Sequence, residues 1–163
     1  MAQKDPNPVL IFGYGNPSRG DDALGPLLLE RLQARPLPGP PSLLTDFQLQ
    51  IEHALDLTGR QRVLFVDASA DAPAPFRYGP LQPALDPSFT THALTPAALL
   101  HVYGQLGQGP PPPCRMLAIR GYRFDLGAPL SPAAERNLAR AVTYVESLLL
   151  RWQGRAHHLP AEG

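Results

Sequence analysis

Short, wholly apolar runs constrain the fold of this chain more than any other feature. Val9–Gly13 and Val63–Val66 contain no polar residue, and Asp67 directly follows the second run. Continuous apolar runs of this length are typical of strands buried on both faces of a parallel sheet. Three further strand candidates are 43–49, 76–81 and 116–119. We therefore expect a sheet whose central strands are fully buried.

Amphipathic stretches separate these runs. Asp21 or Asp22 begins one such stretch, in which Leu24, Leu28 and Leu32 recur at helical spacing. Further helix starts are predicted at 51, at Thr95-Pro96 and at Ser131-Pro132, the last two from a capping hydroxyl followed by proline. Alternating strands and helices predict a three-layer α/β/α fold. We expect one domain over residues 1–163, with an ordered core at about 8–150.

Charge and cysteine content exclude several classes of protein. The formal net charge is zero, so there is no broad positive field for nucleic acid or an anionic membrane. The single cysteine, Cys114, cannot form an internal disulfide, which fits a reducing compartment. The polar start of the chain does not resemble a signal peptide, and no apolar run is long enough to cross a bilayer. We expect a cytoplasmic monomer.

A glycine pair follows the first apolar run, in Gly13-Tyr14-Gly15-Asn16. Such a pair between a strand and a helix suggests a dinucleotide-binding loop. However, the next glycine comes only at Gly20, and two aspartates stand where a pyrophosphate would bind. A nucleotide-binding enzyme is therefore a weak alternative.

Three potential metal ligands lie where such a fold would place them near the carboxyl edge of its sheet: Asp22, Asp67 and His92. Each also has a purely structural interpretation. Asp22 could cap a helix, Asp67 could close a turn after its strand, and a lone loop histidine is usually idle. Taken together, two carboxylates and one imidazole suit Ni²⁺ or Zn²⁺ with coordination positions left open.

Other candidate residues favour structural roles. Glu52 and His53 begin a short predicted helix, where a surface position is the default expectation. Cys114 precedes a strand and is predicted to be buried rather than nucleophilic. Neither a Gly-x-Ser-x-Gly elbow nor a His-Glu-x-x-His pair is present in the sequence.

The segments GYGNPSRGDDALG (13–25), VLFVDAS (63–69) and THALTP (91–96) together resemble the maturation endopeptidases of [NiFe] hydrogenases. The resemblance covers about residues 8–150. It implies a twisted, five-stranded, mostly parallel sheet of the phosphorylase/hydrolase-like type, in which 76–81 is the antiparallel strand. It also implies an aspartic-type hydrolase that removes the C-terminal extension of the hydrogenase large-subunit precursor once nickel is inserted.

The resemblance assigns roles to the three ligands. It implies that Asp22, Asp67 and His92 bind the nickel carried by the substrate, with Asp22 and Asp67 as the catalytic pair. Zn²⁺ or a similar ion is expected to substitute in vitro. The first acid is often glutamate in relatives, so Asp22 reaches less far by one methylene.

A second departure from the family pattern concerns specificity. A glycine-rich turn that relatives use in substrate choice is replaced here by 46–50, DFQLQ. In this respect the chain resembles the branch that serves soluble, NAD-linked bidirectional hydrogenases. A non-catalytic, metal-binding maturation chaperone on the same fold is the principal alternative to the protease.

Overall fold

The computed structural model describes residues 7–37, 39–84 and 94–156. They form a five-stranded sheet of order β2-β1-β3-β5-β4, which is parallel except for β4, antiparallel to β5. The strands are β1 (Val9–Tyr14), β2 (Ser42–Asp46), β3 (Arg62–Ser69), β4 (Phe76–Leu81) and β5 (Cys114–Arg120). The predicted fold class is confirmed, and the antiparallel strand is the expected one.

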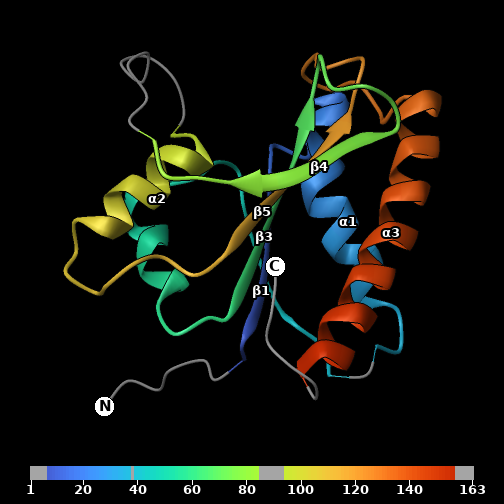
Figure 1. Cartoon of the computed structure of the whole chain (residues 1–163). Helices are drawn as coiled ribbons and strands as arrows, with labels where there is room; N and C mark the ends of the chain where they lie inside the picture. The colour runs from blue at the N-terminus through green and yellow to red at the C-terminus, as the bar shows by residue number, and fades with distance from the viewer. Residues whose placement is uncertain (1–6, 38, 85–93, 157–163) are drawn as a thin grey trace.

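Helices cover both faces of the sheet (Figure 1). The face bearing Ile11 and Leu64 packs against α1 (Leu24–Gln33) and α3 (Pro132–Ala156). The opposite face, with Leu10, Phe12 and Phe65, packs against η2 (Ile51–Leu57) and α2 (Pro96–Gly104). A short helical turn, η1 (Gly20–Ala23), precedes α1. Both faces of β1 and β3 are therefore buried, as their apolar runs predict.

Helix α3 is longer than the sequence pattern suggests. It runs to Ala156, beyond the core expected to end at about residue 150. Trp152 is only 8% exposed, and the Arg62 guanidinium lies 5.2 Å from the centre of its ring. This contact with β3 gives the last turns of the helix a buried anchor. No helix in the described part of the chain is long and apolar enough to span a membrane.

Two strand ends differ from expectation. Strand β2 stops at Asp46 instead of continuing to 49, because the Asp46 carboxylate accepts the Phe47 N–H at 2.7 Å and turns the chain. Strand β3 continues to Ser69 because β5 pairs with it along its whole carboxyl half. Asp67 is therefore inside β3, paired with Ala118, rather than in a loop after it.

Candidate functional site

The candidate site lies where the chain changes direction across the sheet. From β1 the chain passes to β2 on one side, and then returns to β3 on the other side of β1. Open α/β sheets bind ligands at such a switch point, outside the carboxyl ends of the strands. Pairing between β1 and β3 ends at Gly13 and Val66, so Asp67 projects just past this last pair.

Close packing at two glycines brings helix α1 against the strand ends. A side chain on Gly25 would lie 2.6 Å from the Tyr14 carbonyl oxygen and 2.7 Å from that of Val66. A side chain on Gly13 would likewise lie 2.6 Å from the Gly25 carbonyl oxygen. Only hydrogen atoms fit in these gaps. Gly13 and Gly25 thus allow α1 to pack directly against the ends of β1 and β3.

Gly15 extends this packing to Asp22. Its φ of 146° is rarely adopted by other residues, and a side chain here would collide with the Asp22 backbone carbonyl. The Asp22 carboxylate in turn accepts the Asn16 N–H at 2.7 Å. Asp22 therefore folds back over the end of β1 and does not cap the helix that follows.

This hydrogen bond argues against the nucleotide alternative. A dinucleotide-binding loop needs free backbone N–H groups for the pyrophosphate. Here the Asn16 N–H is already bonded to a carboxylate of the same loop, and that negative charge would repel a phosphate. The loop that contains Gly15 and runs to Asp22, called the glycine loop below, thus uses its backbone to bind its own Asp22 carboxylate.

Asp67 is a partly buried carboxylate beside Tyr14. The Ala68 N–H donates to its Oδ1 at 2.8 Å, and strand register and alternation place the Tyr14 side chain on the same face of the neighbouring strand. Burial raises the pKa of Asp67 to about 7, with the neighbouring charge of Asp22 adding to the rise against the hydrogen bond from Ala68. Burial, together with the charge of Asp67, also raises the pKa of Tyr14. The Tyr14 hydroxyl is therefore protonated at neutral pH.

Two carboxylates, Asp22 and Asp67, thus interact at this edge of the sheet. None of the ion pairs among the described residues involves Asp22 or Asp67. A divalent cation would relieve their repulsion, and carboxylate oxygen is a suitable ligand for one. No cluster of three potential ligands occurs within 7–37, 39–84 and 94–156. His92 lies outside the described residues, so the three-ligand site stays a prediction.

Asp21, the adjacent acid, has a different role from the capping that its position suggests. It is 0% exposed, and its carboxylate accepts four hydrogen bonds. The donors are the N–H groups of Tyr122, Arg123 and Ser131 and the Ser131 hydroxyl, at 2.6–3.0 Å. Burial opposes ionisation, but these donors prevail and lower the pKa of Asp21. Asp21 ties the glycine loop to the loop after β5.

His53 is buried, which corrects the surface position expected for it. It is 9% exposed, and Phe12 lies against its ring with centroids 4.6 Å apart. Its Nδ1 accepts the Gln50 N–H at 2.8 Å, and its Nε2 lies 3.2 Å from an oxygen of Asp46. His53 thus fixes the turn between β2 and η2. Glu52 beside it is exposed, as expected.

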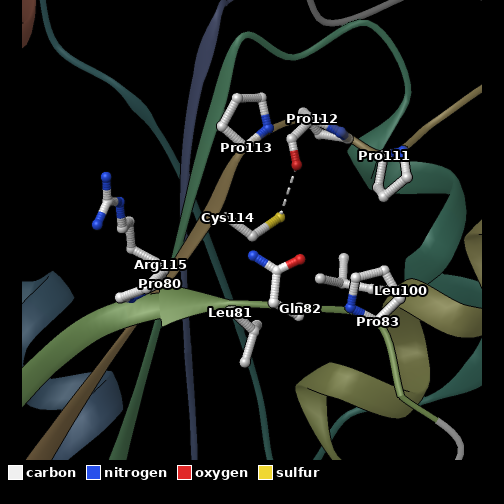
Figure 2. Close-up of a pocket in the computed structure, with 10 residues that line it drawn as sticks. All are labelled: Pro80, Leu81, Gln82, Pro83, Leu100, Pro111, Pro112, Pro113, Cys114 and Arg115. Atoms are coloured by element: carbon white, nitrogen blue, oxygen red, sulfur yellow. Dashed lines mark hydrogen bonds between the residues drawn. The ribbon is translucent and has the colours of Figure 1, made fainter. Parts of the chain in front are cut away.

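Cys114 is buried, as predicted, and lies away from the acids. It begins β5 opposite Val63, whereas Asp67 pairs further along with Ala118. Its thiol donates to the Pro112 carbonyl at 3.2 Å, and burial raises its pKa to about 12 (Figure 2). The surrounding proline-rich groove, of about 470 Å³, lies at this opposite end of β5. A thiol with so high a pKa is a poor nucleophile.

Sequence reasoning missed Tyr14 as a member of this site. A tyrosine at the end of an apolar strand is usually a core residue, and Tyr14 is indeed only 7% exposed. The available signal is strand alternation. Tyr14 shares a sheet face with Phe12, Asp67 shares that face with Phe65, and the two strands are neighbours.

The chain has the fold of the hydrogenase maturation proteases. It superposes on the HycI protease of Thermococcus kodakarensis with a TM-score of 0.67 and 21% identity, over 88% of this chain and 92% of that one. The HybD endopeptidase of Escherichia coli gives 0.69 and 22%, over 88% and 92%. A further E. coli endopeptidase gives 0.70 and 22%, over 90% and 93%. No family model and no curated protein matches the chain.

Proposed function

We propose that this protein is an endopeptidase that removes the C-terminal extension of a [NiFe]-hydrogenase large-subunit precursor after nickel insertion. The observation that carries the proposal is the pairing of Asp22 with Asp67 at the switch point of a fold shared with solved maturation proteases. The NAD-linked branch and a cytoplasmic location belong to the same proposal.

The acidic pair accounts for recognition of a nickel-loaded substrate. Asp22 and Asp67, joined by His92, would bind the nickel ion that the precursor carries. Because Asp67 has a pKa of about 7, an arriving cation displaces a weakly acidic proton at physiological pH. Docking of the ion would then place the adjoining peptide segment against the same edge of the sheet, where Asp22 and Asp67 act on it as the catalytic pair.

An exposed apolar surface beside the site is suited to hold the protein part of the substrate. Phe47 is 63% exposed, Ile51 62% and Leu55 61%, and all three lie just after β2. Tyr14 pairs with Asp46 in the sheet, so this surface adjoins the end of β1. Exposed apolar clusters of this kind commonly mark protein-binding surfaces. We assign this one to the large-subunit precursor.

Precursor processing tests the proposal directly. Purified protein is incubated with nickel-loaded and with nickel-free large-subunit precursor, and the loss of the C-terminal peptide is measured by mass spectrometry. We expect cleavage of the nickel-loaded form alone. Asp67→Asn should remove cleavage, whereas Asp125→Asn, an exposed acid on a neighbouring loop, should keep it.

The same assay separates the protease from its alternative. A non-catalytic chaperone would bind the nickel-loaded precursor and leave its mass unchanged. Stable co-elution without cleavage, by wild-type protein that is folded and free of bound metal, would therefore refute the endopeptidase.

A further inference from the structure

We propose that His53 is a positioning residue that links the end of β2 to η2 and so holds the exposed apolar surface in the shape that binds the large-subunit precursor. The inference rests on the proposed function, because it takes the precursor as the partner of that surface. It goes further by naming the residue on which affinity for the protein part of the substrate depends.

Both nitrogens of the His53 ring take part in this link. Nδ1 accepts the Gln50 N–H at 2.8 Å, so the ring proton is on Nε2. That Nε2 lies 3.2 Å from a carboxylate oxygen of Asp46, the last residue of β2. Phe12 packs edge-on against the ring from β1. A buried ring with both nitrogens engaged is held in one orientation.

The same contacts close the segment that carries the exposed apolar side chains. The Asp46 carboxylate also accepts the Phe47 N–H at 2.7 Å, and the His53 N–H donates to the Gln50 carbonyl at 2.9 Å. Between these two ends, Leu49 is buried and holds the middle of the segment against the core. The backbone that presents the exposed apolar surface is therefore fixed at several points.

The link also fixes this surface relative to the acids. The Gly15 N–H donates to the Asp46 carbonyl at 3.0 Å, and Gly15 belongs to the glycine loop that ends at Asp22. Among the described residues, no hydrogen bond or ion pair joins His53 to Asp22 or Asp67. Loss of the link should therefore weaken precursor binding and leave the chemical step unchanged.

The size of the effect follows from the conformations that the link excludes. Without it, residues 47–55 would exchange between several conformations, and the precursor would bind only one of them. The apparent dissociation constant then rises by the reciprocal of the fraction that can bind. A contact between an N–H group and a carboxylate shifts such an equilibrium roughly tenfold.

Two substitutions of His53 separate the link from the local turn. His53→Asn still places an oxygen near the Gln50 N–H but is too short to reach Asp46, whereas His53→Gln carries an amide N–H toward Asp46. We expect His53→Asn to raise the dissociation constant of labelled nickel-free precursor roughly tenfold, measured by fluorescence anisotropy. His53→Gln should restore most of the affinity. In cleavage of nickel-loaded precursor, His53→Asn should raise KM by a similar factor at unchanged kcat.

Val145→Ala is the control for a general loss of stability, because Val145 is fully buried in the core on the other face of the sheet. Partial unfolding reduces the amount of active enzyme, so it lowers the apparent kcat and leaves KM unchanged. Equal affinity of wild type and His53→Asn for nickel-free precursor would overturn the inference, as would equal losses in both His53 variants or a wild-type chain that does not bind this precursor. Binding that depends on His53 in a chain that cleaves no precursor would refute the proposed function alone.

Discussion

At the scale of single residues, Asp67 is a carboxylate kept where its charge is unfavourable. Burial and the neighbouring Asp22 both oppose its ionisation, and the hydrogen bond from the Ala68 N–H offsets them only in part. Groups with strongly shifted pKa values cluster at functional sites, because a bound ligand can relieve a charge that is unfavourable in the folded protein. The consequence is measurable in the stability of the protein without metal.

Asp67→Asn should stabilise the metal-free protein at high pH. The pKa of Asp67 is about 7 in the folded protein and 3.8 for an aspartate in water, so between these values the folded state retains a proton that the unfolded state has lost. The contribution of this proton to the free energy of unfolding is complete below pH 3.8, and it is lost as the pH rises from 3.8 to about 7. At pH 8 the variant should be the more stable, by at most roughly 4 kcal/mol.

Urea unfolding of both proteins at pH 5, 6, 7 and 8, with a chelator present, measures this difference. The gap between variant and wild type should widen with pH and level off above 7. A variant that is less stable than wild type at pH 8 would show that the Asp67 charge is compensated in the fold.

Asp21→Asn should destabilise the protein far more than its position in an exposed-looking loop suggests. In the wild type, three backbone N–H groups donate to the Asp21 carboxylate oxygens. In the variant, some of these donors would face the side-chain NH₂ group, which cannot accept a hydrogen bond. We expect a loss of roughly 3 kcal/mol in the free energy of unfolding. Asp125→Asn is the control: its side chain is 78% exposed, and its contact with Arg123 is 3.8 Å long. Similar thermal melting of the two variants would contradict this role for Asp21.

The two adjacent aspartates show what the sequence could and could not predict at this scale. Residue patterns alone left open which of the two acids faces the site, and the family resemblance selected Asp22, whose charge interacts with that of Asp67 in the structure. The sequence could not show the role of Asp21, because every donor to its carboxylate lies 101–110 residues away in the chain. The position of His53 was predicted wrongly for a related reason, since its burial depends on contact with Phe12 in β1, far from it in the sequence.

At the scale of elements, the site depends on how closely α1 approaches the ends of β1 and β3. Apolar runs and helical spacing were enough to predict these elements. Their ends were harder to predict, because β2 is ended by a side-chain hydrogen bond and β3 is prolonged by its neighbour β5. The contact at Gly25 sets the distance between the helix and both strands.

Gly25→Ala should push α1 away from the sheet. The new methyl group would lie 2.6 Å and 2.7 Å from two strand carbonyl oxygens that cannot move independently. We expect a destabilisation of roughly 1–3 kcal/mol and a loss of precursor cleavage. Gly154→Ala is a matched control in α3, where no atom lies within 4 Å and alanine favours the helix. Unchanged stability of the first variant, by chemical unfolding, would disprove the close contact.

At the scale of the whole molecule, the two ends of the sheet carry different functional groups. The acids and the exposed apolar surface lie toward the carboxyl edge, whereas the buried thiol and its proline-rich groove lie at the opposite end of β5. The described residues that the proposed reaction uses thus lie on one side of the molecule. A substrate would approach from that side with its metal ion leading.

Zn²⁺ should inhibit processing when it is added before the precursor. Oxygen and nitrogen ligands discriminate poorly between Ni²⁺ and Zn²⁺, so an early ion would occupy the place of the substrate's nickel. Cleavage rates measured with and without preincubation should differ, and a chelator added before the precursor should restore the rate. Rapid cleavage of nickel-free precursor by metal-stripped enzyme would contradict the whole scheme.

The hydrogen bonds of Asp21 also have a consequence for protein synthesis. The glycine loop is made early, but the groups that hold it reach as far as Ser131, 110 residues later. A chain still emerging from the ribosome therefore carries the glycine loop without the hydrogen-bond donors that hold Asp21. The loop takes its final shape only when most of the protein has been translated, and the proposed site at Asp22 and Asp67 is among the last parts of the molecule to form.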